Sequence, residues 1–312
     1  MGFEDRLEAH RVELTAYCYR MLACAAEAED AVQETFIRAW TNADRFDEGR
    51  ARLHTWLYRI ATNVCIDMSR AVQRRALAMD LNPAPSAGGA LGAPLDAGAF
   101  VWPVPDRLVL PSDADPAELA VQRESIRLAF VAALQCLPPR QRAVLILREV
   151  LRWSADETAA LLDSSPAAVN SALQRARATM SERRGPGGSG KIDEDLLDRY
   201  VKAFTSYDVD GLVALLHRDA TMSMPPFAWW LGGREAIRAA LLGAGGVCAD
   251  DQLVRTAANG SAALAQYRDG RAFGLIIVEF RDGLIAALTT YLDPSLFPMF
   301  DLPMTPEPPS RM

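Results

Sequence analysis

At 312 residues, with half of them hydrophobic and 23% charged, the chain has the composition of ordinary folded domains and not that of a disordered or fibrous protein. This length predicts two or three domains, each large enough for its own core. The net charge of −7 excludes binding of nucleic acid through an overall positive field, so any such contact must come from local basic patches.

The five cysteines are odd in number, scattered, and without CxxC spacing: Cys18, Cys24, Cys65, Cys136 and Cys248. They predict reduced core thiols rather than a disulfide framework or a zinc site, and we expect no metal and no cofactor. The N-terminus is charged, and no apolar run approaches the length needed to span a membrane. The sequence therefore predicts a cytoplasmic protein that does not associate with a membrane.

Residues 1–76 predict an all-helical module, which we call the first helical module. Hydrophobic residues recur at helical spacing from Phe3 to Leu22 and predict a first helix. The segment DAVQETFIRAW (30–40) predicts an amphipathic helix with Trp40 beside its packed face and polar side chains on the other face. After a polar hinge, LHTWLYRIATNVCIDMSRAVQRR (53–75) predicts another helix.

The stretch from Arg50 to Arg75 holds six arginines and one acidic residue, Asp67. Its predicted helix also carries Trp56 and Tyr58. Guanidinium groups bind phosphates, and aromatic rings stack on unpaired bases. This stretch therefore predicts a nucleic-acid-binding face.

Residues 77–115 predict a linker, because residues 81–98 are rich in Pro, Gly and Ala and have too little apolar surface to fold alone. Within the linker, FVWPVPDRL (100–108) is too aromatic for a plain spacer. We expect Trp102 to dock, either on the protein itself or on a partner.

Residues 116–184 predict a second helical module. Ser154 and Glu157 have the spacing of a capping box, which predicts the start of a short helix. Ser165 then caps a long helix that has Pro166 at its first position. A short helix, a tight turn and a long polar helix make a helix-turn-helix.

The remaining chain predicts a tether, residues 185–191, followed by a C-terminal module, residues 192–296, and a Pro-rich tail, residues 297–312. The tether is Gly-rich and flexible, and it is not a phosphate loop because Ile192 stands where GxxxxGK[ST] requires Ser or Thr. The C-terminal module begins with helices and continues with strands, including a hairpin at Asp282-Gly283. This order predicts an α+β fold.

The segments DAVQETFIRAW and TWLYRIATNVCIDMSR closely resemble conserved region 2 of bacterial sigma factors of the extracytoplasmic-function (ECF) type. The resemblance covers about residues 10–76 and implies a helix that binds the clamp of core RNA polymerase through Asp30, Gln33, Glu34, Phe36 and Arg38. It also implies that the unpaired minus-10 strand of a promoter is bound by Phe46, Arg52, Trp56, Arg59, Ile60, Asn63 and Arg70. The hinge between Phe46 and Trp56 is longer than in some relatives, so the identity of the minus-10 base does not follow.

LPPRQRAVLILREVLRWSADETAALLDSSPAAVNSALQRARATM resembles region 4 of the same sigma factors. In that family the long helix lies in the major groove of the minus-35 promoter element. The resemblance implies that minus-35 DNA is contacted by Asn170, Ser171, Gln174, Arg175 and Arg177, the last of these on phosphate. Asn170 and Ala172 stand where relatives often have Arg or Lys, so the minus-35 sequence does not follow.

LLDRYVKAFTSYDVDGLVALLHRDATMSMPPFAWWLGGREAIRAAL resembles the start of the SnoaL-like, NTF2-like cone fold, in which helices close one side of a curved sheet around an apolar pocket. That pocket is implied to be lined by Met222, Met224, Trp229, Trp230, Tyr267, Phe273 and Tyr291. Some such domains are enzymes, and His217, Asp219 and Glu279 are the titratable groups available here. Because Met-rich aromatic sets are mostly core, we expect no catalytic residues.

Taken together, the resemblances imply two all-α sigma modules and a C-terminal α+β cone-shaped module. The implied partners are core RNA polymerase, through its beta-prime clamp and beta flap, and promoter DNA. The C-terminal module is interpreted as a fused regulatory or ligand-sensing module, which either binds a small apolar ligand or has a purely structural or regulatory role. Two alternatives stay open. One is an enzyme or ligand-binding protein anchored to DNA, and the other is a transcription regulator that binds duplex DNA alone.

Overall fold

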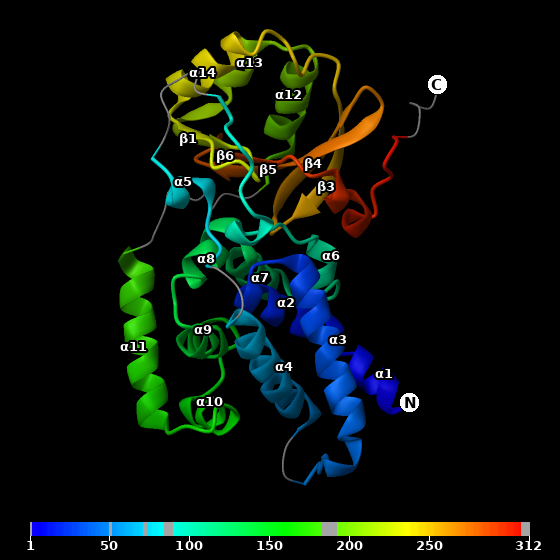
Figure 1. Ribbon diagram of the computed structural model, residues 1–312, viewed down its shortest axis with the longest axis vertical. Coiled ribbons are helices and arrows are strands. Elements are labelled where there is room, and N and C mark those ends of the chain that lie inside the picture. Colours follow the sequence, from blue (N-terminus) through cyan, green and yellow to red (C-terminus); the bar gives the residue numbers. More distant parts are fainter. Residues whose placement is uncertain (1, 50–51, 71–73, 84–89, 183–191, 307–312) are drawn as a thin grey trace. The chain divides into compact units, whose positions relative to one another are not determined.

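The computed structural model describes residues 2–49, 52–70, 74–83, 90–182 and 192–306 (Figure 1). These residues form two compact units. The first unit combines the described residues up to 76 with those from 101 to 182, and the second combines those of 77–100 with 192–306. The predicted tether, residues 185–191, lies outside the described residues.

In the first unit, the first helical module contains α1 (Phe3–Glu8), α2 (Arg11–Leu22), α3 (Ala25–Thr41), the 3-10 helix η1 (Ala43–Arg45) and α4 (Leu53–Ser69). The first helix expected from Phe3 to Leu22 is divided before α2, because His10 has a non-helical backbone with φ −99° and ψ 0°. Every residue of α2 from Leu14 onward is buried, and α2 packs on both α3 and α4. It is therefore the central helix of the module. The helix expected to reach Arg75 ends at Ser69.

The second helical module contains α7 (Pro116–Ile126), α8 (Leu128–Leu134), α9 (Pro139–Leu145), the π-helical turn η3 (Ile146–Val150), α10 (Ala155–Leu161) and α11 (Pro166–Glu182). A break at Arg127, with ψ 144°, separates α7 from α8. The capping box is confirmed: the Glu157 amide donates to Ser154 Oγ at 3.1 Å, and the Ser154 amide donates to Glu157 Oε2 at 2.8 Å. Helices α10 and α11 thus form the helix-turn-helix predicted from these caps.

The second unit is built on a six-stranded sheet in the order β2-β1-β6-β5-β4-β3, in which β1 and β6 are parallel and the other neighbours antiparallel. The strands are β1 (Leu216–Ser223), β2 (Trp230–Gly232), β3 (Gln252–Ala258), β4 (Ser261–Arg268), β5 (Arg271–Arg281) and β6 (Leu284–Tyr291). Its core lies between one face of the sheet and the helices α12 (Glu194–Thr205), α13 (Val209–Ala214) and α14 (Arg234–Gly243). This arrangement confirms the α+β prediction.

Three tight hairpins organise the sheet, and each uses a pair of residues with positive φ. The pair Asp282-Gly283, predicted from the sequence, joins β5 to β6 with φ 53° and 70°. Asn259-Gly260 joins β3 to β4, and Asp269-Gly270 joins β4 to β5, again with positive φ at both residues of each pair. Such pairs favour type I′ turns, whose twist matches that of the paired strands.

The predicted linker, residues 77–115, contains α5 (Ala78–Leu81), η2 (Ala97–Ala99) and α6 (Asp106–Val109), and it is divided between the two units. Trp102 docks in the first unit, where its amide donates to the Ala23 carbonyl at 2.9 Å and its carbonyl accepts from Tyr19 Oη at 2.9 Å. By contrast, Phe100 is fully buried in a cluster of the second unit with Ala78 and Ala99. The linker is therefore packed structure rather than a spacer.

The described part of the expected tail is packed as well. Its first residues belong to the 3-10 helix η4 (Pro294–Phe300), and Phe297 is buried with its ring 5.1 Å from that of Tyr267. Tyr267 Oη donates to the Pro303 carbonyl at 2.9 Å, and the Ala272 amide donates to the Met304 carbonyl at 2.8 Å. Residues 297–304 are thus part of the second unit, because aromatic burial outweighs the local preference of the prolines for an extended chain.

Candidate nucleic-acid and polymerase interface

Helix α3 presents a polar face away from its buried side, which carries Ala28, Ala31, Val32, Thr35 and Ala39. Asp30, Gln33 and Arg38 are exposed, and Glu34 is half-buried. Arg38 Nε donates to Glu34 Oε1 at 2.6 Å, one turn apart. The guanidinium of Arg11 lies 5.0 Å from the ring centre of the half-buried Phe36. The predicted polymerase-binding residues therefore all lie on the single helix α3.

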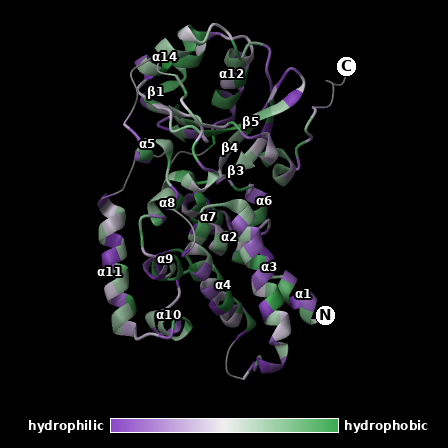
Figure 2. Cartoon of the chain, in the orientation of Figure 1, coloured by the Kyte–Doolittle hydropathy of each residue, from purple (hydrophilic) through white to green (hydrophobic). Residues whose placement is uncertain are grey.

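Two large apolar side chains also lie exposed on α3. Ile37 is 53% exposed and Trp40 is 54% exposed, with the Trp40 ring 6.1 Å from that of Phe3. The sequence pattern placed Trp40 beside the packed face, and the structure corrects this. Trp is among the residue types that dominate protein–protein binding energy. The exposed face of α3 thus has the mixed polar and apolar character of a protein-binding surface. Figure 2 shows both hydrophilic and hydrophobic residues along this helix.

The predicted minus-10 residues lie on α4 or in the segments that flank it, with Phe46 and Arg52 before it and Arg70 directly after it. The ring of Phe46 is stacked on that of Trp56, with centroids 5.0 Å apart and planes inclined by 27°. Arg52, Arg59 and Asn63 are exposed and Ile60 is half-buried, whereas Leu53, Leu57 and Val64 face the core. Arg70 pairs with Asp67 at 3.2 Å. The helix therefore offers aromatic, amide and guanidinium groups on its accessible side.

Helix α11, like α4, has one buried side and one exposed side. Val169, Leu173 and Ala176 are buried, and the predicted minus-35 residues are exposed: Asn170, Ser171, Gln174, Arg175 and Arg177. Arg177 Nη2 forms an ion pair with Glu149 Oε1. The Arg177 guanidinium, which the sequence assigned to phosphate, is therefore partly neutralised in this structure.

The two helical modules meet at α4. Arg59 Nη2 lies 2.7 and 2.8 Å from the two carboxylate oxygens of Asp163, in the turn before α11. The Trp153 ring lies 5.3 Å from the rings of both His54 and Tyr58. Sequence reasoning missed these contacts, because residues about a hundred positions apart share no local pattern.

A carboxylate also lies against this aromatic group. Glu13 on α2 accepts from His10 Nδ1 at 2.6 Å and lies 3.6 Å from His54 Nε2. Burial by itself raises the pKa of the Glu13 carboxyl, but the hydrogen bonds and charges of His54 and His10 outweigh that effect and lower the pKa. Glu13 therefore stays ionised and joins α2 to α4.

The predicted pocket residues of the C-terminal module do not share one set of contacts. Met222 and Trp229 belong to the core between helices and sheet, and Met224 packs against it. Trp230 packs instead on the cluster of Ala78, Ala99 and Phe100. Tyr267 contacts Phe297, and the half-buried Phe273 lies under the guanidinium of Arg268 at 3.8 Å. Tyr291 is fully buried.

The titratable groups of this module are likewise spread out. His217 Nδ1 accepts from the Asp219 amide at 3.1 Å, and Asp219 is exposed. Asp251, which the sequence did not single out, is buried and pairs with Arg268 Nη2 at 2.9 Å. Among the described residues, no group of His, Cys, Asp and Glu could hold a metal ion. No helix in the described part of the chain is long and apolar enough to cross a membrane.

Comparisons with known proteins agree with this division of the chain. Residues 7–75 match sigma-70 region 2, residues 127–180 match sigma-70 region 4, and residues 197–288 match the SnoaL-like domain. The ECF RNA polymerase sigma factor SigG of Mycobacterium tuberculosis is 40% identical over 319 residues, which cover 96% of this chain and 84% of that protein. SigW of Bacillus subtilis is 31% identical over 58% of this chain and 88% of its own length.

The fold also matches a solved structure over nearly its whole length. The crystal structure of the M. tuberculosis ECF sigma factor SigJ aligns with a TM-score of 0.63 at 23% identity, covering 97% of this chain and 100% of that chain. The first helical module is thus region 2, the second is region 4, and the C-terminal module is SnoaL-like. The chain belongs to the ECF RNA polymerase sigma factors, which bind core RNA polymerase and promoter DNA to direct transcription initiation, and it carries a C-terminal SnoaL-like domain.

Proposed function

We propose that this sigma factor is controlled by its own SnoaL-like domain, which acts on the linker between region 2 and region 4. The observation that carries this proposal is that linker residues 77–100 belong to the same compact unit as the SnoaL-like domain. In the same proposal, α3 binds the polymerase clamp, the exposed side of α4 binds the minus-10 strand, and α11 reads the minus-35 element.

Specific contacts attach the linker to the loop between β1 and β2. The Leu95 amide donates to the Pro226 carbonyl at 2.8 Å, and Pro94 forms a bridge with Phe227. Trp230 Nε1 donates to the Asn82 carbonyl at 2.7 Å. Because the bonds fall near both ends of this linker segment, moving the linker requires several contacts to break together.

The linker returns to region 2 as soon as it leaves the SnoaL-like domain. The Val101 amide donates to the Ala76 carbonyl at 3.2 Å, and both residues are buried. The chain therefore leaves the first unit after Ala76 and returns to it at Val101, and these two residues are hydrogen-bonded to each other. We infer that this closure shortens the span that the linker can provide between region 2 and region 4.

Promoter binding requires a long distance between region 2 and region 4. The minus-10 and minus-35 elements are about 25 base pairs apart, or about 85 Å at 3.4 Å per base pair. Here Arg59 and Asp163 are in contact, so region 2 and region 4 are far too close to engage both elements at once. We infer that the linker must be released before initiation, and that the SnoaL-like domain opposes this release.

Transcription with core polymerase tests the proposal. Phe100→Ala removes the buried ring that anchors the linker in the SnoaL-like unit and should raise promoter-dependent run-off transcription relative to the unaltered chain. Leu242→Ala, on a side chain that is 54% exposed, is the matched control and should leave transcription unchanged. Equal transcription from the Phe100 variant and the control, at equal folded concentration, would remove the regulatory role assigned to the linker.

A further inference from the structure

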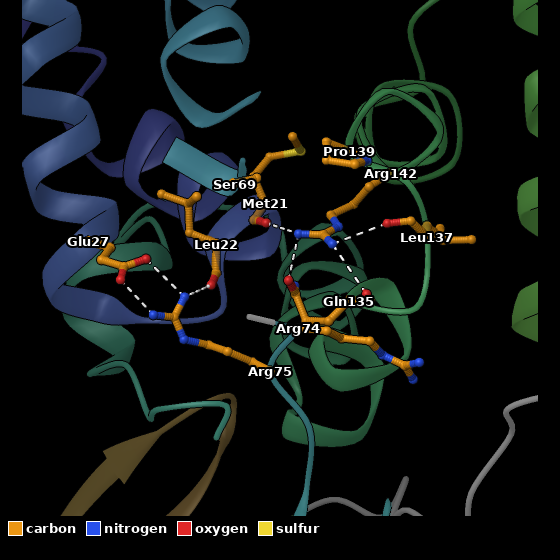
Figure 3. A pocket seen from close by; sticks show the side chains of 10 residues that line it. All are labelled: Met21, Leu22, Glu27, Ser69, Arg74, Arg75, Gln135, Leu137, Pro139 and Arg142. Atoms are coloured by element: carbon orange, nitrogen blue, oxygen red, sulfur yellow. Dashed lines mark hydrogen bonds and ion pairs between the residues drawn. The ribbon is translucent and has the colours of Figure 1, made fainter. Parts of the chain in front are cut away.

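A cavity of about 190 Å³ lies in the first unit between region 2 and region 4 (Figure 3). Region 2 lines it with α2, α3, the end of α4 and Arg74 and Arg75, and region 4 lines it with the turn before α9 and with Arg142 of α9. A water molecule takes up about 30 Å³ in the liquid, so a small polyatomic ion fits. The cavity includes none of the proposed promoter-binding or polymerase-binding residues.

The charges around this arginine cavity do not balance. Arg74, Arg75 and Arg142 line it together with a single carboxylate, Glu27, so the lining carries three positive charges and one negative charge. Glu27 is already paired with Arg75 through contacts of 2.8 and 2.5 Å. Within the part of the chain that the structure describes, neither Arg74 nor Arg142 has a carboxylate partner. The lining therefore has a surplus of two positive charges.

Arg142 is buried to about the same extent as Arg75, and it is only 6% exposed. All its hydrogen-bond acceptors are neutral: Nε donates to the Leu134 carbonyl at 3.0 Å, and the Nη atoms reach the Gln135 side chain and the Met21 and Leu137 carbonyls. Burial is the largest of the causes that lower the pKa of Arg142 to about 10; the charges of Arg74 and Arg75 act in the same direction, and Cys65 and Cys136 oppose it. The guanidinium therefore remains charged at neutral pH, with no carboxylate partner among the described residues.

Arg75 keeps one buried donor unused, although it is paired with Glu27. Its side chain is 6% exposed, and its Nε–H is buried without an acceptor among the described residues. A buried charge that lacks a partner of opposite sign is costly, and a bound anion removes that cost. Guanidinium groups fit the oxygens of phosphate particularly well because they present several N–H donors in one plane. Arg74 is exposed and lines the same cavity, with its Nη2 donating to Cys136 Sγ at 2.5 Å.

We propose that the arginine cavity binds a free phosphoryl anion of the size of phosphate or diphosphate, and that this anion ties region 2 to region 4. Region 2 supplies Arg74 and Arg75 and region 4 supplies Arg142, so the complete site exists only while the two regions are packed together. A ligand that binds one arrangement stabilises that arrangement in proportion to its differential affinity. The anion therefore opposes the separation that promoter binding requires.

Titration calorimetry and thermal melting of the full chain with sodium diphosphate, against sodium chloride at equal ionic strength, test this site. We expect saturable one-to-one binding and a melting temperature that rises with diphosphate concentration. Arg74→Gln should weaken binding at least about ten-fold, because charge-assisted bonds to phosphate are strong. Arg140→Gln removes an exposed arginine of α9 outside the cavity and should bind as the unaltered chain does.

Two further measurements separate the proposal from its alternatives. Diphosphate should slow hydrogen exchange of the amides in residues 136–145, which belong to region 4. An unchanged exchange rate would overturn the proposal that the bound anion ties region 4 to region 2. A single-stranded oligonucleotide at equal phosphate concentration should not displace diphosphate, since displacement would assign the cavity to the nucleic-acid backbone instead. Absence of saturable binding, or equal affinities for the Arg74 and Arg140 variants, would refute the site itself.

Discussion

The guanidinium of Arg59 and the carboxylate of Asp163 form an ion pair between region 2 and region 4, with Nη2 2.7 and 2.8 Å from the two oxygens. The side chains are 47% and 71% exposed, so the pair contributes at most about 1 kcal/mol. In the proposed minus-10 contact, a phosphate of the DNA strand would present the same kind of anion to Arg59. We infer that promoter DNA competes directly with Asp163 for this guanidinium.

Asp163→Asn should therefore increase transcription. The change removes the competing charge while keeping the left-handed backbone of residue 163, φ 48°, which asparagine tolerates. If the packed arrangement loses up to about 1 kcal/mol of stability, transcription should increase by up to about five-fold. Run-off transcription at limiting sigma factor measures this increase, and Asp156→Asn on α10 is the control variant. A decrease for Asp163→Asn alone would contradict the competition.

Glu34→Lys should weaken binding to core polymerase while leaving the fold intact. Glu34 pairs with Arg38 across one helical turn, with side chains 43% and 44% exposed, and such surface pairs contribute about 0.3–0.5 kcal/mol. A circular-dichroism melt should therefore change little, whereas affinity for core polymerase should fall clearly because the charge on the binding face is reversed. Glu118→Lys on α7 makes the same charge change away from α3. Undiminished polymerase affinity for the Glu34 variant would remove α3 from the interface.

Arg175 and Arg177 should differ in what they contribute to minus-35 binding. Both are exposed on α11, but Arg177 is paired with Glu149. A bidentate contact of Arg175 with a base should contribute roughly 1–3 kcal/mol at one base pair, so Arg175→Ala should relax specificity at that position. Arg177→Ala should weaken binding about equally for all sequences. Binding profiles over a promoter library distinguish these results, and an unchanged base preference for Arg175→Ala would exclude it from base reading.

The packing of α2 on α4 should weaken in acid through Glu13. The folded protein lowers the pKa of this carboxyl, so the stability it contributes is present above the ordinary pKa near 4.5 and is lost as pH falls through the lowered value. Glu13→Gln should reduce stability at pH 7 and flatten the fall in melting temperature between pH 5 and pH 3. Melting curves of both proteins across this range measure the difference. If the melting temperatures of the two proteins fall in parallel as the pH is lowered, Glu13 is not the cause of the loss of stability in acid.

The sequence by itself was sufficient for the elements whose signals are local. The capping box at Ser154, the hairpin at Asp282-Gly283 and the helical repeats of α3 and α11 depend on neighbours within a few residues, and the structure contains all of them. The exposed polar sides of α3, α4 and α11 follow from the same 3.6-residue period. The resemblance to sigma regions 2 and 4 then assigned these faces to polymerase and promoter DNA.

Tertiary structure decided what those faces contact and where the linker lies. The side chain of Trp40 is exposed although its spacing suggested otherwise, and its ring lies 6.1 Å from that of Phe3. Phe100 and Trp102 are two residues apart yet are buried in different units, which composition alone does not determine. The surplus of charge at Arg142 likewise depends on segments that are more than a hundred residues apart, Met21 and α9, meeting in one place. Local periodicity shows which side of an element is buried, but the partner that buries it is chosen by packing of the whole chain.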